Sequence, residues 1–156
     1  MHSLSDSIKR DLESYRARIN QHLQKFFKHV SENDVVQAAE KAGGIVSGFA
    51  DIYSLIFHGT EVKSNRRKRE MLVEFLNEVK EHDLEIRELL TKEYRGHVET
   101  LVGSLADLHS FFFGGASIKD EDVKRYLEHA SKILPILHQY SHILYEYYLE
   151  QSAITT

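Results

Sequence analysis

The chain has 156 residues, the size of one domain, and 42% of them are hydrophobic while 28% are charged. Eight glycines, one proline and no cysteine exclude a collagen repeat, a disulfide scaffold and any site built on thiolates. Because 24 Asp and Glu outnumber 20 Lys and Arg, the net charge of −4 gives no general attraction to phosphate backbones, and nucleic acid is not expected as a partner.

Neither a secretory signal nor a membrane span is predicted. The residues from Met1 to Asp6 do not join a basic stretch to an apolar one, as a signal peptide would. No uninterrupted apolar run approaches the ~20 residues that a membrane-spanning helix needs. The sequence therefore predicts a cytoplasmic protein.

An amphipathic helix is predicted over roughly residues 3–31, because apolar residues recur there every three or four positions while charged residues fill the gaps. This apolar stripe consists of Leu4, Ile8, Leu12, Tyr15, Ile19, Leu23, Phe26 and Val30.

A second helix is predicted over about 34–58. Asn33 or Asp34 offers its N-terminal cap, and Gly59 marks its end. Its interior is apolar nearly all round, and the glycine pair at 43–44 is expected to weaken or split it, because each internal glycine costs about 1 kcal/mol relative to alanine.

The next two helices are expected on either side of Gly96. The first begins near Ser64 or Asn65 and presents Leu72 and Phe75 on its apolar face. The second is apolar and covers about 97–113.

The last helix is predicted to open at a capping box, in which Ser117 is followed by Asp120 or Glu121. Pro135 is expected to kink this helix, because proline cannot donate the hydrogen bond of the helix interior. Residues 151–156 are expected to fray.

An internal similarity links two of these helices. Residues 45–60 read IVSGFADIYSLIFHGT and residues 101–116 read LVGSLADLHSFFFGGA, and they align without gaps. Each contains a single formal charge, Asp51 or Asp107. One interpretation is a duplicated helical hairpin; the other is a chance likeness between two buried helices of similar composition.

These patterns predict an all-α, five-helix bundle that forms a single domain over residues 1–156. The two Gly-rich helices, at about 34–58 and 97–113, should be buried at its centre, because a helix that is apolar nearly all round has no face for water. The three long amphipathic helices should surround them.

Asp51 and Asp107 are the first candidate binding residues. An aspartate within an apolar helix must be paired, hydrogen-bonded or shifted in pKa if it is buried. Together they could hold a cation, a proton or a ligand at the bundle centre; alternatively, each lies on a solvent-facing edge or pairs with a basic side chain for purely structural reasons.

A basic cluster supplies the second set of candidates, Arg66, Arg67, Lys68 and Arg69. It could contact a phosphate group, although positive charge at a helix N-terminus opposes the helix dipole. The plainer interpretation is a solvated first helical turn beside the glutamates that follow it.

Metal and cofactor binding are not expected. His138, His142 and Glu146 share one helix face at the spacing that metal ligands use, but the other helices supply no matching ligand motif. A surface or interface pair of histidines is the preferred interpretation.

A membrane-active role is the main alternative to a binding role. Gly44 and Gly48 form the GxxxG pattern that lets helices touch in lipid, and the basic cluster at 66–69 follows this apolar segment. The core helices of water-soluble bundles carry the same pattern.

The leading prediction is a non-enzymatic adaptor, inhibitor or regulatory subunit that binds another protein or its own copies. No dinucleotide, P-loop, nucleophile-elbow or zinc-protease motif is present. Aromatic residues would suit such an interface; they are Phe26, Phe27, Tyr140, Tyr145, Tyr147 and Tyr148. Tyr147 is the one most expected to be exposed, since it lies off the apolar stripe. The alternatives are a membrane-perturbing effector, and a ligand or metal sensor built on the central Asp and His residues.

Overall fold

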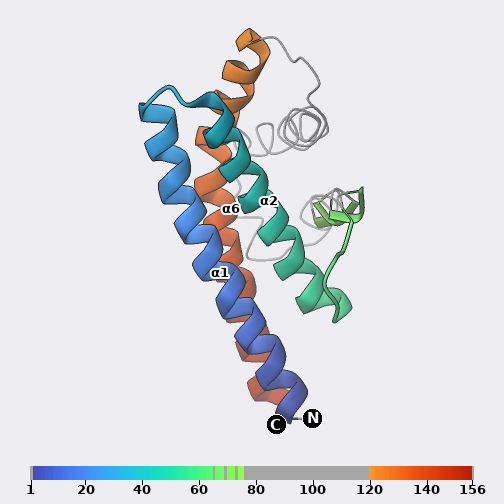
Figure 1. Ribbon diagram of the computed structural model, residues 1–156. Coiled ribbons are helices and arrows are strands. Elements are labelled where there is room, and N and C mark those ends of the chain that lie inside the picture. The colour runs from blue at the N-terminus through green and yellow to red at the C-terminus, as the bar shows by residue number, and fades with distance from the viewer. Residues whose placement is uncertain (1, 65, 69, 73, 76–119, 156) are drawn as a thin grey trace.

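The computed structural model describes the chain except for residues 1, 65, 69, 73, 76–119 and 156. Within the described part it is all α, as predicted, with three long helices and no strand. These helices are α1 (His2–Ser31), α2 (Val35–His58) and α6 (Asp120–Thr155), and they pack together as a bundle (Figure 1). A shorter helical segment lies within residues 66–75.

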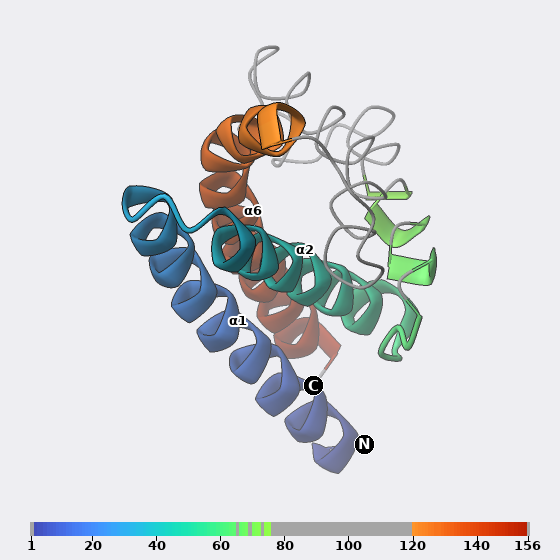
Figure 2. The same ribbon diagram turned by 45° about the horizontal axis from the view of Figure 1, so that its top comes forward.

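The helices are arranged with α2 between α1 and the segment 61–75 (Figures 1 and 2). Helix α1 runs antiparallel to both α2 and α6, so the start of α1 and the end of α6 lie at the same end of the bundle (Figure 1). The predicted helix at 97–113, Gly96 and the second copy of the repeat lie outside the described residues.

Helix α1 follows the sequence pattern closely. Leu12, Ile19 and Phe26, spaced by two helical turns, are almost completely buried. The residues between them on the stripe are partly buried against the same core, namely Ile8, Tyr15, Leu23 and Val30. Of the aromatic residues proposed for an interface, Phe26 therefore belongs to the core.

Helix α2 is capped at both ends by the residues its sequence suggests. The Asp34 side chain accepts a hydrogen bond from the Gln37 N–H at 3.3 Å. Gly59 adopts φ +76°, a left-handed conformation that suits glycine, and its N–H donates to the Leu55 carbonyl. The expected split at residues 43–44 is wrong, because α2 continues through them without interruption.

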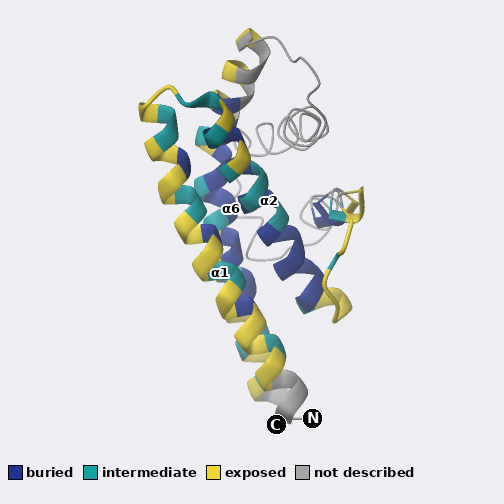
Figure 3. Ribbon diagram, viewed as in Figure 1, coloured by how far each residue is buried: buried dark blue, intermediate teal, exposed yellow. Residues whose placement is uncertain are grey.

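Helix α2 is buried along most of its length (Figure 3). This confirms that the Gly-rich helix at 34–58 is a core helix. Its lower half is buried all round from Gly48 to Leu55, so it has no solvent face on which Asp51 could lie.

Two glycines of α2 let α1 approach closely. A Cβ added to Gly44 would lie 3.1 Å from the His22 ring, and one added to Gly48 would lie 3.0 Å from Ile19 Cγ1. The GxxxG pattern thus brings two helices of the bundle together, the same geometric role that it has in lipid. Packing against α1 also explains why the glycine pair at 43–44 does not break the helix, since tertiary contacts outweigh helix propensity.

The segment that follows α2 starts its helix as predicted. Ser64 Oγ accepts a hydrogen bond from the Arg67 N–H at 3.2 Å, and Leu72 and Phe75 are buried. The Phe75 ring contacts Phe49 of α2 edge-on at 5.0 Å and Tyr140 of α6 at 5.7 Å. This aromatic contact ties the segment to both helices.

Helix α6 contradicts one detail of its prediction: it remains helical to Thr155, so the expected fraying over 151–156 is wrong for its described residues. Pro135 lies inside this helix, and the kink expected there stays a prediction. Tyr140 and Tyr145 are buried rather than free for an interface. The capping box at Ser117 lies outside the described residues.

Gly48→Ala is expected to lower the free energy of unfolding by about 1 kcal/mol. Overpacking against Ile19 costs about 1–3 kcal/mol, and the helix propensity of alanine offsets about 1 kcal/mol of that. Denaturant unfolding of a double-mutant cycle measures the contact: in an Ile19→Ala background, Gly48→Ala should be neutral or stabilising. Equal effects in both backgrounds would show that the two residues do not press on each other.

Candidate functional site

Asp51 is a buried charge in the middle of α2, with only 7% of its surface exposed. Its Oδ2 atom lies 3.4 Å from Lys68 Nζ, which also donates a hydrogen bond to Ser47 Oγ. Ser47 and Asp51 are one helical turn apart on α2, so both can meet one ammonium group. The structure thus joins two candidate residues, Asp51 and Lys68, that the sequence placed in separate sets.

The surroundings of Asp51 act on its pKa in opposite directions. Burial raises the pKa of the Asp51 carboxyl, and this effect is the largest. The Lys68 ammonium and the backbone N–H of Val62 lower that pKa, while the nearby Glu61 raises it; the net pKa lies above its ordinary value. Oδ1 of Asp51 is buried and accepts no hydrogen bond in good geometry from the described residues.

A cavity of about 420 Å³ opens beside this ion pair. It lies between α1, α2 and the segment after α2, and its walls are Tyr15, Arg18, His22, Gly44, Ser47, Gly48, Asp51, Glu61, Val62, Lys63 and Lys68. The Tyr15 hydroxyl donates to Glu61 Oε1, which closes one side. Five of the wall residues carry formal charge, and three of them, Arg18, Glu61 and Lys63, are exposed.

His22 forms another wall of the cavity. Burial lowers the pKa of His22, and the positive charges of Lys41, Lys25 and Arg18 lower it further. Its Nδ1 atom is buried and has no hydrogen-bond partner in the described part of the chain. His22 therefore contributes a neutral ring to the wall of the cavity, while its Nδ1 atom is buried.

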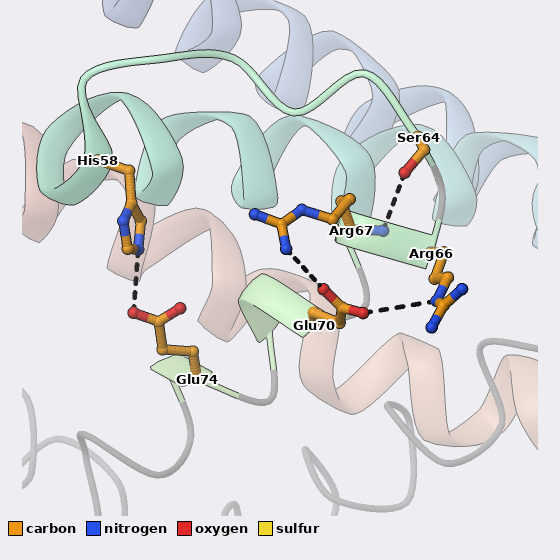
Figure 4. Close-up of polar contacts among 6 residues, drawn as sticks. All are labelled: His58, Ser64, Arg66, Arg67, Glu70 and Glu74. Carbon is orange, nitrogen blue, oxygen red and sulfur yellow. Dashed lines mark hydrogen bonds and ion pairs between the residues drawn. The ribbon is translucent and has the colours of Figure 1, made fainter.

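The rest of the basic cluster behaves differently from Lys68. Arg66 and Arg67 are exposed and pair with the same carboxylate, that of Glu70, at 3.6 and 3.0 Å (Figure 4). Pairs of this kind contribute little to stability. Arg69 lies outside the described residues. A phosphate group at this cluster would therefore compete with Asp51 for Lys68, and with Glu70 for Arg66 and Arg67.

Tyr147 is exposed, as predicted, with 39% of its surface accessible. Its ring stacks on Phe57, which is 38% exposed, with 6.0 Å between the ring centroids and 21° between the planes. Below this pair, the buried Tyr53 ring lies 4.8 Å from Phe57. The sequence did not single out Phe57 as an interface residue. Its position in the last turn of the helix that ends at Gly59 could have indicated that it is exposed.

Beside the aromatic pair, a side-chain hydrogen bond joins α2 to the segment that follows it. His58 Nε2 lies 2.9 Å from Glu74 Oε1 (Figure 4). Together, Phe57, Tyr147, His58 and Glu74 form an apolar centre with a charged edge, which we call the aromatic patch.

One of the two histidines predicted to share a face of the last helix, His142, contacts α1. Nδ1 of His142 meets Arg16 Nη2, and because a guanidinium only donates, the ring nitrogen accepts. The Arg16 guanidinium also lies 4.3 Å from the centre of the Tyr145 ring, whose hydroxyl donates to Glu13 Oε1 at 2.7 Å. Burial and this hydrogen bond raise the pKa of Tyr145 to about 12.

No cluster of metal-ligating side chains exists among the described residues. The second candidate aspartate, Asp107, lies outside the described residues. No described helix is long and apolar enough to cross a bilayer.

Comparison with known proteins adds no assignment: the chain matches no protein-family model, no curated protein and no solved structure at a significant level.

Lys68→Met is expected to lower the free energy of unfolding by about 2 kcal/mol near pH 7, because Asp51 would remain as an unpaired buried charge. The raised pKa means that the folded state holds the Asp51 proton more tightly than the unfolded state, whose value is 3.8. Ionisation of Asp51 thus costs stability as pH rises through its folded pKa. Since Lys68 offsets that cost, its loss should matter much less near pH 4.

Urea unfolding of both proteins at the two pH values checks this expectation. Lys63→Met is the matched control, since Lys63 is an exposed lysine of the same segment. It should change stability little at either pH. An equal loss for Lys68→Met at both pH values would show that Asp51 does not depend on the lysine charge.

Proposed function

We propose that this chain is a non-enzymatic helical-bundle protein that acts by binding another protein or further copies of itself, as an adaptor, inhibitor or regulatory subunit. The observation that carries the proposal is the stacked, exposed pair Phe57 and Tyr147. The proposal includes the single five-helix domain predicted over 1–156 and a cytoplasmic location.

The aromatic patch has the composition of a protein interface. Aromatic side chains are enriched at interface centres, where they bury a large area at a small entropic cost, and charged groups are typical of the rim. Here Phe57 rests on the buried Tyr53, so its ring is held in place from below. An anchor that is already ordered loses less entropy on binding than a mobile side chain does.

The polar side chains of the other described clusters mostly contact one another within the protein. Lys68 is engaged by Asp51, and Tyr145 and His142 by α1 residues, which supports a binding role over a catalytic one. The membrane-perturbing alternative would require α2 to leave α1. The close contacts at Gly44 and Gly48 oppose that separation.

The proposal is tested by measuring association of the purified full chain with and without the aromatic patch. Sedimentation velocity from about 1 μM to 1 mM would detect self-association over the affinity range of ordinary complexes. Affinity capture with tagged protein would detect a different partner. The double variant Phe57→Ser, Tyr147→Ser is expected to weaken either association by at least about tenfold, as loss of anchor residues does.

A matched control is Val36→Ser, which removes another exposed apolar side chain at the opposite end of α2 from Phe57. It should leave association unchanged. The proposal would be contradicted by two results together. The protein would be monomeric at every concentration, and the wild type and the double variant would capture the same proteins. Leakage of anionic liposomes on addition of the wild-type chain would favour the membrane-perturbing alternative instead.

A further inference from the structure

His22 fills the close contact between α1 and α2 with a titratable ring. A Cβ added to Gly44 would lie 3.1 Å from both Nε2 and Cδ2 of this ring, so the imidazole packs directly against the backbone of α2. Its Nδ1 atom is buried and has no hydrogen-bond partner among the described residues. A side chain that can gain a charge therefore lies where the two helices are closest.

The neutral and protonated forms of the His22 ring place different demands on this contact. A neutral imidazole can hold its single proton on Nε2 and leave Nδ1 bare, whereas an imidazolium carries an N–H on both nitrogens. Protonation would put a charged donor at Nδ1, where the described residues offer no acceptor. Because burying an unpaired charge costs far more than burying an unpaired neutral atom, the protonated ring disfavours the closed contact.

The charges that face His22 also oppose its protonation. The titratable and charged groups around it come from α1, from α2 and from the segment after α2; they are Tyr15, Arg18, Lys25, Glu40, Lys41, Asp51, Glu61, Lys63 and Lys68. Two of the three carboxylates are already engaged, Glu61 by the Tyr15 hydroxyl and Asp51 by Lys68. Glu40 raises the pKa of His22, but burial and then Lys41, Lys25 and Arg18 lower it, and the net pKa lies below its ordinary value.

We propose that His22 makes the contact between α1 and α2 an acid-sensitive switch, in which the neutral ring keeps α1 against Gly44 and protonation in mildly acidic solution moves the two helices apart. The ring cannot escape toward α2, because it already meets the backbone there. Relief comes only when the helices separate and water reaches Nδ1. That separation also uncovers Ile19 and Gly48, which press on each other one turn away.

The first experiment compares urea unfolding of the wild type and of His22→Gln at about pH 7.5 and about pH 5.5. The folded state binds the His22 proton less tightly than the unfolded state, whose pKa is 6.5, so His22 costs stability as the pH falls below that value. One pH unit below it, this cost can reach about tenfold in the unfolding equilibrium constant. On acidification the wild type should lose about threefold to tenfold more stability than His22→Gln does.

A distance measurement tests whether the contact opens. The chain has no cysteine, so a pair of introduced cysteines accepts spin labels at those two positions alone. Ser14→Cys on α1 and Thr60→Cys just after α2 are both exposed. The distance between the labels should lengthen or broaden between about pH 7.5 and about pH 5.5, and it should stay unchanged when His22→Gln is added.

A second variant and a control separate this role from a general effect of acid. Lys41→Gln removes a cation that opposes protonation and leaves the ring in place, so it should reduce the acid-dependent loss even if His22→Gln does not fold. His58→Gln is the matched control. Because His58 faces the carboxylate of Glu74, its removal should leave the acid-dependent loss at least as large as in the wild type.

The proposal is overturned if the wild type and His22→Gln lose stability equally on acidification. It is also overturned if the label distance is the same at both pH values. An opening that persists in His22→Gln would do the same, because a different group would then drive it.

Discussion

The close crossing of α1 and α2 is the constraint on which the rest of the described structure depends. Gly44 and Gly48 bring the backbone of α2 against His22 and Ile19. That approach is why the cavity has residues of both helices in its walls and why His22 reaches it at all. A wider spacing would separate Arg18 from Asp51 and would leave the α2 core in contact with water.

The ion pair of Asp51 and Lys68 fixes the chain after α2 in a similar way. A carboxylate within the apolar helix is unfavourable by itself, and the lysine offsets part of that cost while it holds the segment 61–75 against α2. Once held, this segment supplies Glu61 and Lys63 to the cavity, and Phe75 to the core. The Asp51–Lys68 contact thus positions both the polar residues of the cavity wall and an aromatic residue of the core.

Local features of the fold could be predicted from the sequence, and contacts between distant residues could not. The bounds of α1 and α2, the caps of α2 and the stripe through Leu12, Ile19 and Phe26 all follow from the spacing of residues within a few positions of one another. The partner of Asp51 lies seventeen residues along the chain, in a run of basic residues that looks uniform. Lys68 contacts Asp51 and Arg66 does not, because the two side chains lie on different faces of the short helix.

The glycines and the aromatic residues show the same limit. The GxxxG spacing indicates close helix contact, but it cannot say whether the contact lies in lipid or in a bundle. The low helix propensity of the glycine pair at 43–44 led to the wrong expectation of a split α2. The off-stripe position of Tyr147 predicted its exposure correctly. Its stacking on Phe57 depends on how α2 and α6 are placed, which no local pattern encodes.

The long separation of α6 from its partners in the chain has a consequence for the order of assembly. Helices α1 and α2 are joined by the short turn at 32–34, so their hairpin closes almost without loop entropy. Tyr145 of α6, in contrast, meets Glu13 across 132 positions. Because loop closure disfavours early contacts between residues that distant, we expect the α1–α2 hairpin to form first and α6 to dock on it.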